Sequence, residues 1–178
     1  MKFPAKKLGL FAGILAMSCQ SVAQDPSELN DLQIAHVAYV ADNIDIQYAH
    51  LALALSEDPA VRGFAETMVS DHNAVNAQAL ALLQKLNAQP QNNFLSESLQ
   101  STSADIVDEL SRLRGNEFDL RYAENELAYH QAVNELVENA FIPNIENPEV
   151  KSLFQEGLKI FKAHEELAAN MLRQIKTN

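Results

Sequence analysis

The sequence is poor in three residue types, and each scarcity narrows the kind of protein it encodes. Among 178 residues there are one cysteine (Cys19), no tryptophan and five glycines. One cysteine cannot close an intramolecular disulfide or supply the several thiolates of a zinc-finger type of site. No glycine-rich loop of the kind that cradles phosphate is present. The scarcity of glycine fits a helical protein better than a β-sandwich.

Basic residues are also scarce. There are 13 lysines and arginines against 24 aspartates and glutamates, which gives a net charge of −11. A strongly negative chain is repelled by nucleic acid and by anionic lipid surfaces. We therefore expect no nucleic-acid partner.

The first 23 residues have the three parts of a secretory signal peptide. Three lysines stand near the start, residues 8–17 form an apolar run, and residues 21–23 (Ser-Val-Ala) form a small-x-small cleavage site. The apolar run is too short to span a bilayer. We predict an exported bacterial protein, periplasmic or secreted, whose mature part is one domain of residues 24–178. Loss of the three lysines would change its net charge from −11 to about −14.

Cys19 allows a second interpretation of this segment. Lipoprotein processing at Met17-Ser18-Cys19 would make Cys19 the acylated anchor of the mature chain, although Ala16 and Met17 match the usual Leu-rich box poorly. A third interpretation is an N-terminal helix of the mature domain. Cleavage after Ala23 would leave no thiol, which excludes cysteine chemistry. No later segment approaches the roughly 20 apolar residues that a membrane span requires.

Four helix starts can be recognised in the predicted mature domain. Three have a capping side chain followed at once by proline: Asp25-Pro26, Asp58-Pro59 and Asn147-Pro148. The side chain accepts hydrogen bonds from free N–H groups of the first turn. Proline is tolerated there because the backbone N–H that it lacks would have no partner within the helix. The fourth start is Gly115-Asn116, where Asn116 would cap and Asp119 would oppose the positive helix end.

Apolar residues recur at helical spacing after each start. The stripes run from Ile34 to Leu55, from Val61 to Leu83, from Phe118 to Phe141 and from Val150 to Ile175. Each helix would contain about 26 to 30 residues and extend roughly 40 to 45 Å. Helices of matched length are typical of a bundle.

The connections indicate how these helices are joined. Short connections at residues 56–58 and 143–146 predict two antiparallel hairpins. Between the second and third helices lies a polar stretch, residues 89–103, followed by a short amphipathic helix from Ile106 to Leu113. This connection is long enough to travel the whole bundle. The sequence therefore predicts an all-α, ferritin-like four-helix bundle with a long crossover, containing a short helix, between helices 2 and 3.

The five histidines fall into two groups. His36 and His50 lie on the polar side of the first helix, and we expect both to be solvated. The other three each continue the apolar stripe of their own helix, and one aspartate does so on the first helix. The inward-facing set is therefore Asp45, His72, His130 and His164.

Counting residues from the helix ends places these four side chains within one helical turn of each other. A buried Asp45 must be neutral, paired with a protonated histidine, or coordinated to a cation. Three imidazoles and one carboxylate would suit zinc, copper(II) or iron(II), whereas calcium and magnesium prefer all-oxygen sites. Two interpretations stay open: one transition-metal ion supported by Asp71, Tyr48 or Glu126, or a buried hydrogen-bond network.

Two segments and the last histidine resemble a large bacterial domain-of-unknown-function family with a ferritin-like fold. The segments are residues 64–80 (FAETMVSDHNAVNAQAL) and 115–133 (GNEFDLRYAENELAYHQAV). Members of that family are often labelled predicted outer membrane proteins and carry signal peptides. Its motifs correspond here to Asp71-His72, to Phe118-Asp119 with Tyr122 and His130, and to His164. Asp45 stands where members commonly carry glutamate.

The resemblance, which covers roughly residues 31–172, implies the fold but no established reaction. The wider ferritin-like group suggests a di-metal site, which needs Glu-x-x-His on two helices. The positions three before the inward histidines hold Val69, Leu127 and Phe161 instead. We therefore expect at most one metal ion and no di-iron oxidase.

Two functional hypotheses follow. The first is an exported protein that binds one transition-metal ion in the bundle core, and the second is a non-catalytic structural or protein-interaction module of the cell envelope with a buried His/Asp network. An enzyme is the least supported class, because the spacing offers no Ser-His-Asp or Cys-His arrangement. A glycosidase-type carboxylate pair is also missing, since Asp45 is the only acid predicted to face inward.

Overall fold

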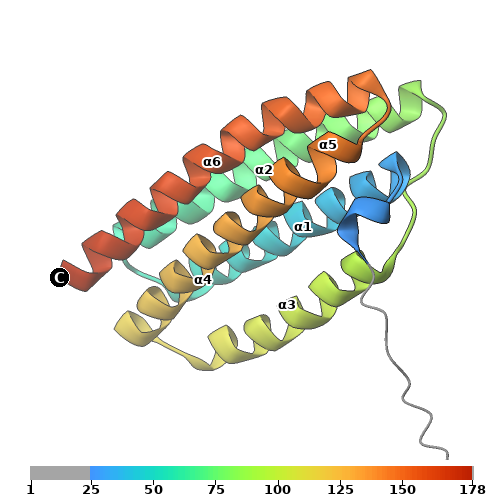
Figure 1. The fold of residues 1–178 in the computed structure, drawn as a ribbon. Helices are drawn as coiled ribbons and strands as arrows, with labels where there is room; N and C mark the ends of the chain where they lie inside the picture. The colour runs from blue at the N-terminus through green and yellow to red at the C-terminus, as the bar shows by residue number, and fades with distance from the viewer. Residues whose placement is uncertain (1–24, 178) are drawn as a thin grey trace, which may run out of the picture.

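The computed structural model describes residues 25–177, and all regular structure in this range is helical (Figure 1). The long helices are α1 (Asp31–Leu55), α2 (Pro59–Lys85), α3 (Phe94–Arg112), α4 (Gly115–Leu136) and α6 (Pro148–Thr177). A 3-10 turn (Pro26–Glu28) precedes α1, and a π-helical turn (Val137–Phe141) followed by α5 (Ile142–Asn144) continues α4. The predicted all-α class is confirmed. The signal-peptide prediction for residues 1–23 lies outside the described residues.

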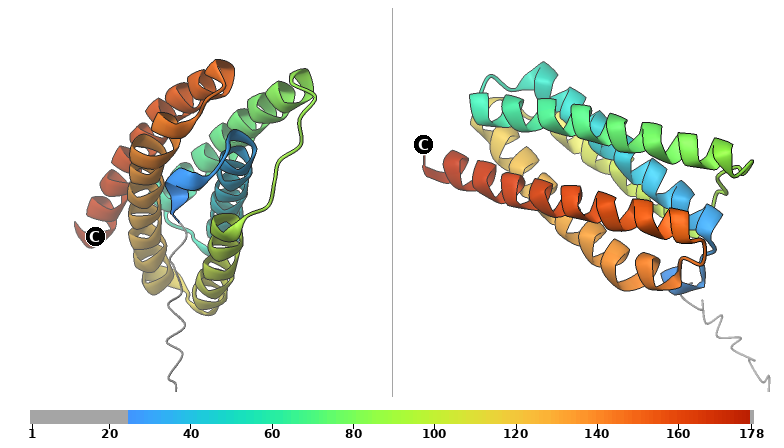
Figure 2. Two further views of the ribbon diagram at one scale, coloured as in Figure 1. Left: turned by 45° about the vertical axis from the view of Figure 1, so that its right-hand side comes forward. Right: turned by 90° about the horizontal axis from the view of Figure 1, so that it is seen from above.

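Four of the long helices surround one core. The antiparallel neighbours α1 and α2 form one pair, α4 and α6 form another, and the pairs meet where α2 packs on α6 and α1 packs on α4 (Figure 1). α3 returns the chain along the molecule from the end of α2 to the start of α4, so α2 and α4 run in the same direction. Figure 2 shows α3 beside α1 and on the far side from α6. None of the helices in the described range is both long and apolar enough for a membrane span.

Three of the four predicted helix starts are correct in position, those of α2, α4 and α6. The Asp58 side chain accepts hydrogen bonds from first-turn N–H groups of α2, and the Asn147 side chain does the same for α6. The start predicted for the first long helix is wrong, because Asp25 caps only the 3-10 turn. α1 begins at Asp31 instead, since Asn30 and Gln33 form a reciprocal capping box there.

The cap predicted at Asn116 is also wrong. α4 begins at Gly115, whose φ of +56° is a left-handed conformation that suits glycine, and no side chain caps this end. Asp119 was expected to oppose the positive end of α4. It accepts a hydrogen bond from the buried Ser56 hydroxyl in the α1–α2 turn, and so ties that turn to α4.

The crossover contains more helix than the sequence predicted. α3 begins at Phe94 within the stretch expected to be simply polar, because Asn93 and Ser96 form a second capping box. Leu110 of α3 is fully buried, and it belongs to the same apolar cluster as residues of α1, α2 and α4. The crossover therefore completes the core as well as connecting the two hairpins.

The core is divided along its length by a layer of polar side chains. One apolar cluster, which includes Phe64, Met68 and Phe118, lies on one side of the layer. A second cluster, which includes Val137 and Phe141, lies on the other side. The polar layer is therefore bounded by packed apolar residues at both ends.

Candidate metal centre

Four helices each contribute one side chain to this polar layer. These side chains are Asp45 from α1, His72 from α2, His130 from α4 and His164 from α6, with exposed fractions of 0%, 4%, 2% and 1%. The structure thus brings together all four residues that the sequence predicted to face inward. Whether they bind a metal ion stays a prediction.

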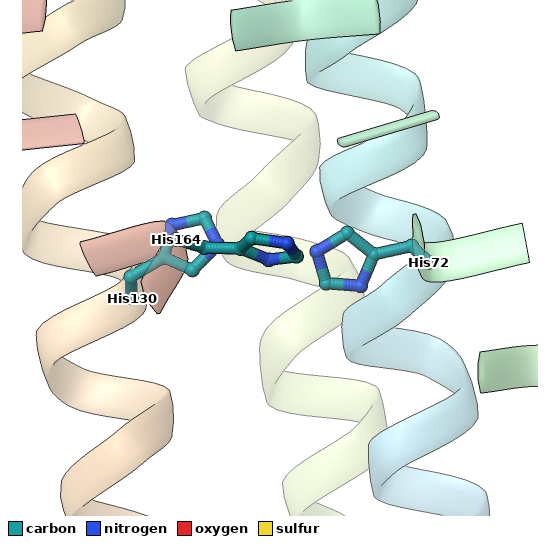
Figure 3. A group of neighbouring side chains, drawn as sticks. All are labelled: His72, His130 and His164. Carbon is teal, nitrogen blue, oxygen red and sulfur yellow. The ribbon is translucent and has the colours of Figure 1, made fainter. Parts of the chain in front are cut away.

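The side chains lie close enough to share one ligand. One ring nitrogen from each of the three histidines lies within 4.8 Å of the others, and Figure 3 shows the three rings at one level. The Oδ2 atom of Asp45 lies 2.6 Å from Nε2 of His72 and 3.4 Å from Nε2 of His130. Asp45 therefore adjoins the group of three histidines at His72 and His130, and a second close group of Asp45, Glu126 and His130 shares His130 with it.

One ring nitrogen of each histidine forms a hydrogen bond with an oxygen, and this bond fixes the orientation of the ring. His72 Nδ1 lies 2.8 Å from Asp42 Oδ1, His130 Nδ1 lies 2.9 Å from the backbone oxygen of Glu126, and His164 Nε2 lies 3.0 Å from Asp71 Oδ2. Because these partners are acceptors, the bonded ring nitrogen is the donor, and the opposite nitrogen faces the centre. Histidines that bind metals are almost always oriented in this way. Asp71 thus has the supporting place that the sequence predicted for it.

The atoms that face the centre lack hydrogen-bond partners among the described residues. They are both carboxylate oxygens of Asp45, Nε2 of His72, Nε2 of His130 and Nδ1 of His164. The short approach between Asp45 and His72 is an ion-pair contact without hydrogen-bond geometry. A buried polar atom without a partner is uncommon and costs free energy. A cation at the centre would satisfy all of these atoms at once.

The charges of the site are balanced around His72. Burial by itself lowers the pKa of this histidine, but its hydrogen bond to Asp42 and its ion-pair contact with Asp45 raise that pKa to about 10. Burial favours the neutral form of Asp45, but His130 and His72 lower its pKa below the usual range. Without a metal ion, a protonated His72 therefore neutralises an ionised Asp45. A metal ion would have to displace this proton.

Two further acids of the site are buried: Asp42, which was not predicted, and Glu126, which was predicted only as a supporting partner. The prediction that Asp45 is the only inward-facing acid is therefore wrong. Asp42 lies one turn before Asp45, and Glu126 lies one turn before His130, so both share a face with a predicted residue. Burial and the neighbouring Asp45 charge raise the pKa of Glu126 well above its usual range. Carboxyl oxygens of Asp45 and Glu126 and a nitrogen of His130 also lie within 4.8 Å of one another.

Aromatic rings complete the walls of the centre. The Phe161 ring stacks on His72 with centroids 5.2 Å apart and an angle of 13°, and Phe64 meets His130 edge-on at 6.1 Å. Tyr48, predicted as a supporting partner, instead packs edge-on against Tyr129 with centroids 5.8 Å apart. Such a shell lowers the local polarity and fixes the orientation of the rings.

The two histidines predicted to be solvated differ from each other. His50 is exposed, as predicted, but His36 is half-buried and its Nδ1 is shielded from solvent. The physical reason is that α1 packs against α2, α3 and α4, which leaves little of its surface to water. Neither residue belongs to the group of four.

Comparison with known proteins gives a family without an assigned activity. A family model described as a domain of unknown function (DUF4142) matches residues 16–171, a range that contains all four converging side chains. The predicted membership of a family of unknown function is therefore confirmed. Comparisons with the curated proteins and with the solved structures gave no match.

Proposed function

The chain belongs to the family described as a domain of unknown function (DUF4142), and we propose that it binds one transition-metal ion in the core of its helical bundle. The ligands would be Asp45, His72, His130 and His164. The proposal rests on the orientation of the three histidines. Each donates its outer ring N–H to an oxygen, and one nitrogen of each ring lies within 4.8 Å of the other two, with the buried Asp45 carboxylate against His72 and His130.

The donor set indicates which ions would fit. Three imidazole nitrogens and one carboxylate suit zinc, copper(II) or iron(II), and a site without several oxygens does not suit calcium or magnesium. The second group of donors, Asp45 with Glu126, shares His130 with the first. This sharing favours a single centre over two independent sites. Glu126 would serve either as a further oxygen ligand of the ion or as a hydrogen-bond donor to Asp45.

The burial of the ligands favours a protein that holds a metal over one that catalyses with it. Metal sites closed by four protein ligands are typically structural or storage sites, whereas catalytic zinc keeps a position for water. We therefore propose a role in buffering or sensing a transition metal. The signal-like segment at residues 1–23 supports placing this role in the periplasm or cell envelope.

We also propose that the fold belongs to the ferritin-like class. Its support is the pairing of α1 with α2 and of α4 with α6, linked by a crossover that runs the length of the molecule. The site would nevertheless differ from ferritin-like di-metal centres, because the Glu-x-x-His motifs are replaced at Val69, Leu127 and Phe161.

A zinc titration tests the proposed function. The protein would first be treated with a chelator and then titrated with Zn(II) by isothermal calorimetry, with Mg(II) as the comparison ion. We expect one zinc ion per chain and no binding of magnesium. Zinc binding absent from the folded, chelator-treated protein would refute the proposal.

A structural role is the second candidate, and the ion pair of His72 with its two aspartates favours it. His72 lies between Asp42 and Asp45, so the site has internal charge balance without a metal ion. Buried pairs of this kind can fix the register of packed helices. Under this hypothesis replacing all three histidines with glutamine preserves capture of an envelope partner, and the melting temperature is indifferent to chelator and to zinc.

The hydrogen bond between His164 and Asp71 predicts a partial loss of zinc affinity when Asp71 is replaced. Replacing Asp71 with alanine removes the acceptor of the His164 Nε2–H group and frees the ring to turn, so we expect zinc affinity to fall by about 10-fold. Competition with a chromophoric chelator measures this change. Asp105→Ala is the matched control, because it removes one exposed carboxylate from α3, far along the chain from the site. Equal affinities of the two variants would show that Asp71 does not position the ring.

A further inference from the structure

A cleft lined by α1, α2 and α6 borders the polar layer. About 50 Å³ of its space can be entered by groups the size of a water molecule, and the total empty space of the cleft is about 560 Å³ when the open solvent at its mouth is included. None of the four proposed metal ligands lines it. Its walls are almost entirely apolar and include Leu83, Val150, Phe154 and Phe161. The cleft is therefore a site of its own, beside the centre described above.

Asn76 supplies an unsatisfied polar group on this apolar lining. It lies one turn after His72 on α2, its exposed fraction is 6%, and its Oδ1 atom has no hydrogen-bond partner among the described residues. A buried carboxamide oxygen without a partner costs free energy that a leucine in the same place would avoid. Asp42 is the only charged residue on the lining, and its Oδ1 atom is already bonded to His72. Among the lining residues, which also include Tyr39, Asn76 Oδ1 is thus the buried side-chain atom without a hydrogen-bond partner.

A glycine keeps the cleft open from the opposite wall. Gly157 is buried in the middle of α6, and a Cβ atom built there would meet only the Phe161 ring, at 3.6 Å. The left-handed conformations that favour glycine are not needed at this helical position, and glycine weakens a helix relative to alanine. Any larger side chain at this position would therefore project into the empty space.

We propose that the cleft binds a small amphipathic molecule with one apolar body, such as a single aromatic ring or a short alkyl chain, and one hydroxyl group. The hydroxyl would donate a hydrogen bond to Asn76 Oδ1, and the apolar body would lie between Gly157 and the neighbouring apolar walls. A small molecule fits better than a protein segment, because Asn76, which carries the unpartnered oxygen, is more than nine-tenths buried. Ligand sites commonly combine apolar walls with one or two polar groups that fix orientation.

This proposal does not depend on metal binding, but the two sites adjoin. The Phe161 ring lines the cleft and also stacks on His72, and Asp42 lines the cleft and also bonds to His72. A molecule in the cleft would therefore contact the groups that hold one proposed metal ligand in place.

The test compares two probes that differ in one hydrogen-bond donor. 4-Ethylphenol and its methyl ether, 4-ethylanisole, are titrated into the isotope-labelled full chain, and binding is followed by amide chemical shifts. We expect saturable shifts centred on α1, α2 and α6 around the cleft, and roughly 10-fold weaker binding of the ether because it lacks the donor. Asn76→Ala should abolish this preference while the ether still binds.

The second part of the test uses a variant whose new side chain fills the cleft. Gly157→Leu should weaken both probes by more than about 10-fold, which corresponds to the loss of most of the apolar contact. Gly63→Leu is the matched control, since Gly63 lies on α2 outside the cleft and a Cβ atom there meets nothing within 4 Å. Gly157→Ala, a smaller change that favours the helix, should weaken binding less and keeps the test valid if the leucine variant unfolds.

Three outcomes would overturn the proposal. They are shifts that do not saturate, equal binding to the wild type and to a folded Gly157→Leu variant, and cleft signals that change with protein concentration alone, which would indicate a second copy of the chain in the cleft. Failure of the zinc titration would leave these results unaffected. The two proposals can therefore fail independently.

Discussion

Replacing His130 with alanine is expected to lower the affinity of the protein for Zn(II) by more than about 100-fold. Loss of a residue that is hydrogen-bonded to a metal ligand already lowers metal affinity by roughly 10- to 100-fold, so loss of a ligand itself should lower it further. His130 is the most informative choice, because its ring nitrogens belong to both groups of closely spaced buried donors. Competition with a chromophoric chelator over a range of zinc concentrations measures the change.

The control for this replacement is His50→Ala, which removes an exposed histidine from α1. It should leave zinc affinity unchanged. Circular dichroism establishes that the His130 variant retains its helices before the affinities are compared. If the two variants bind zinc equally well, His130 is not a ligand, and the zinc occupies some other part of the chain.

Zinc is expected to raise the melting temperature of the protein by about 8 to 16 °C. Free zinc at about 1,000 times the dissociation constant stabilises the folded state by about 4 kcal/mol, and in a domain of this size each kcal/mol corresponds to roughly 2 to 4 °C. This stabilisation would come from coordinate bonds to buried atoms that otherwise lack hydrogen-bond partners, formed as the extra proton of His72 is released. Differential scanning calorimetry with and without zinc measures the shift.

Asp45→Asn serves as the comparison for the thermal shift. It preserves the shape of the side chain but removes the carboxylate that contacts His72 and His130, so most of the zinc-dependent shift should disappear. Magnesium should produce no shift in either protein. A wild-type melting temperature unaffected by zinc would instead favour the structural network held by His72.

The helices were largely predictable because their signals are local. Caps at Asp58 and Asn147, each followed by proline, mark the starts of α2 and α6 in the sequence itself. Asp25 gave the same signal but was wrong for α1, since the capping box at Asn30 begins the long helix. Both positions carry a local capping signal, so the sequence alone does not show which of the two begins the long helix.

The site was predictable as a set of residues but not as an arrangement. The inward histidines and Asp45 follow from helical spacing alone. Asp42 was missed, and the burial of Glu126 was not predicted, because acids at the border of an apolar stripe are usually solvated, and only the packing of a neighbouring helix buries them. The bond between His164 and Asp71 joins α6 to α2, and the sequence does not determine the distance between residues of different helices.

The central claim is that Asp45 and three histidines enclose one metal ion, and zinc K-edge X-ray absorption on protein loaded with one equivalent of zinc tests it most directly. We expect four or five nitrogen and oxygen neighbours at about 2.0 to 2.1 Å, no sulfur neighbour, and the outer scattering of about three imidazole rings. Six oxygen neighbours without imidazole scattering would place the zinc on the acidic surface. That result would contradict the proposed site.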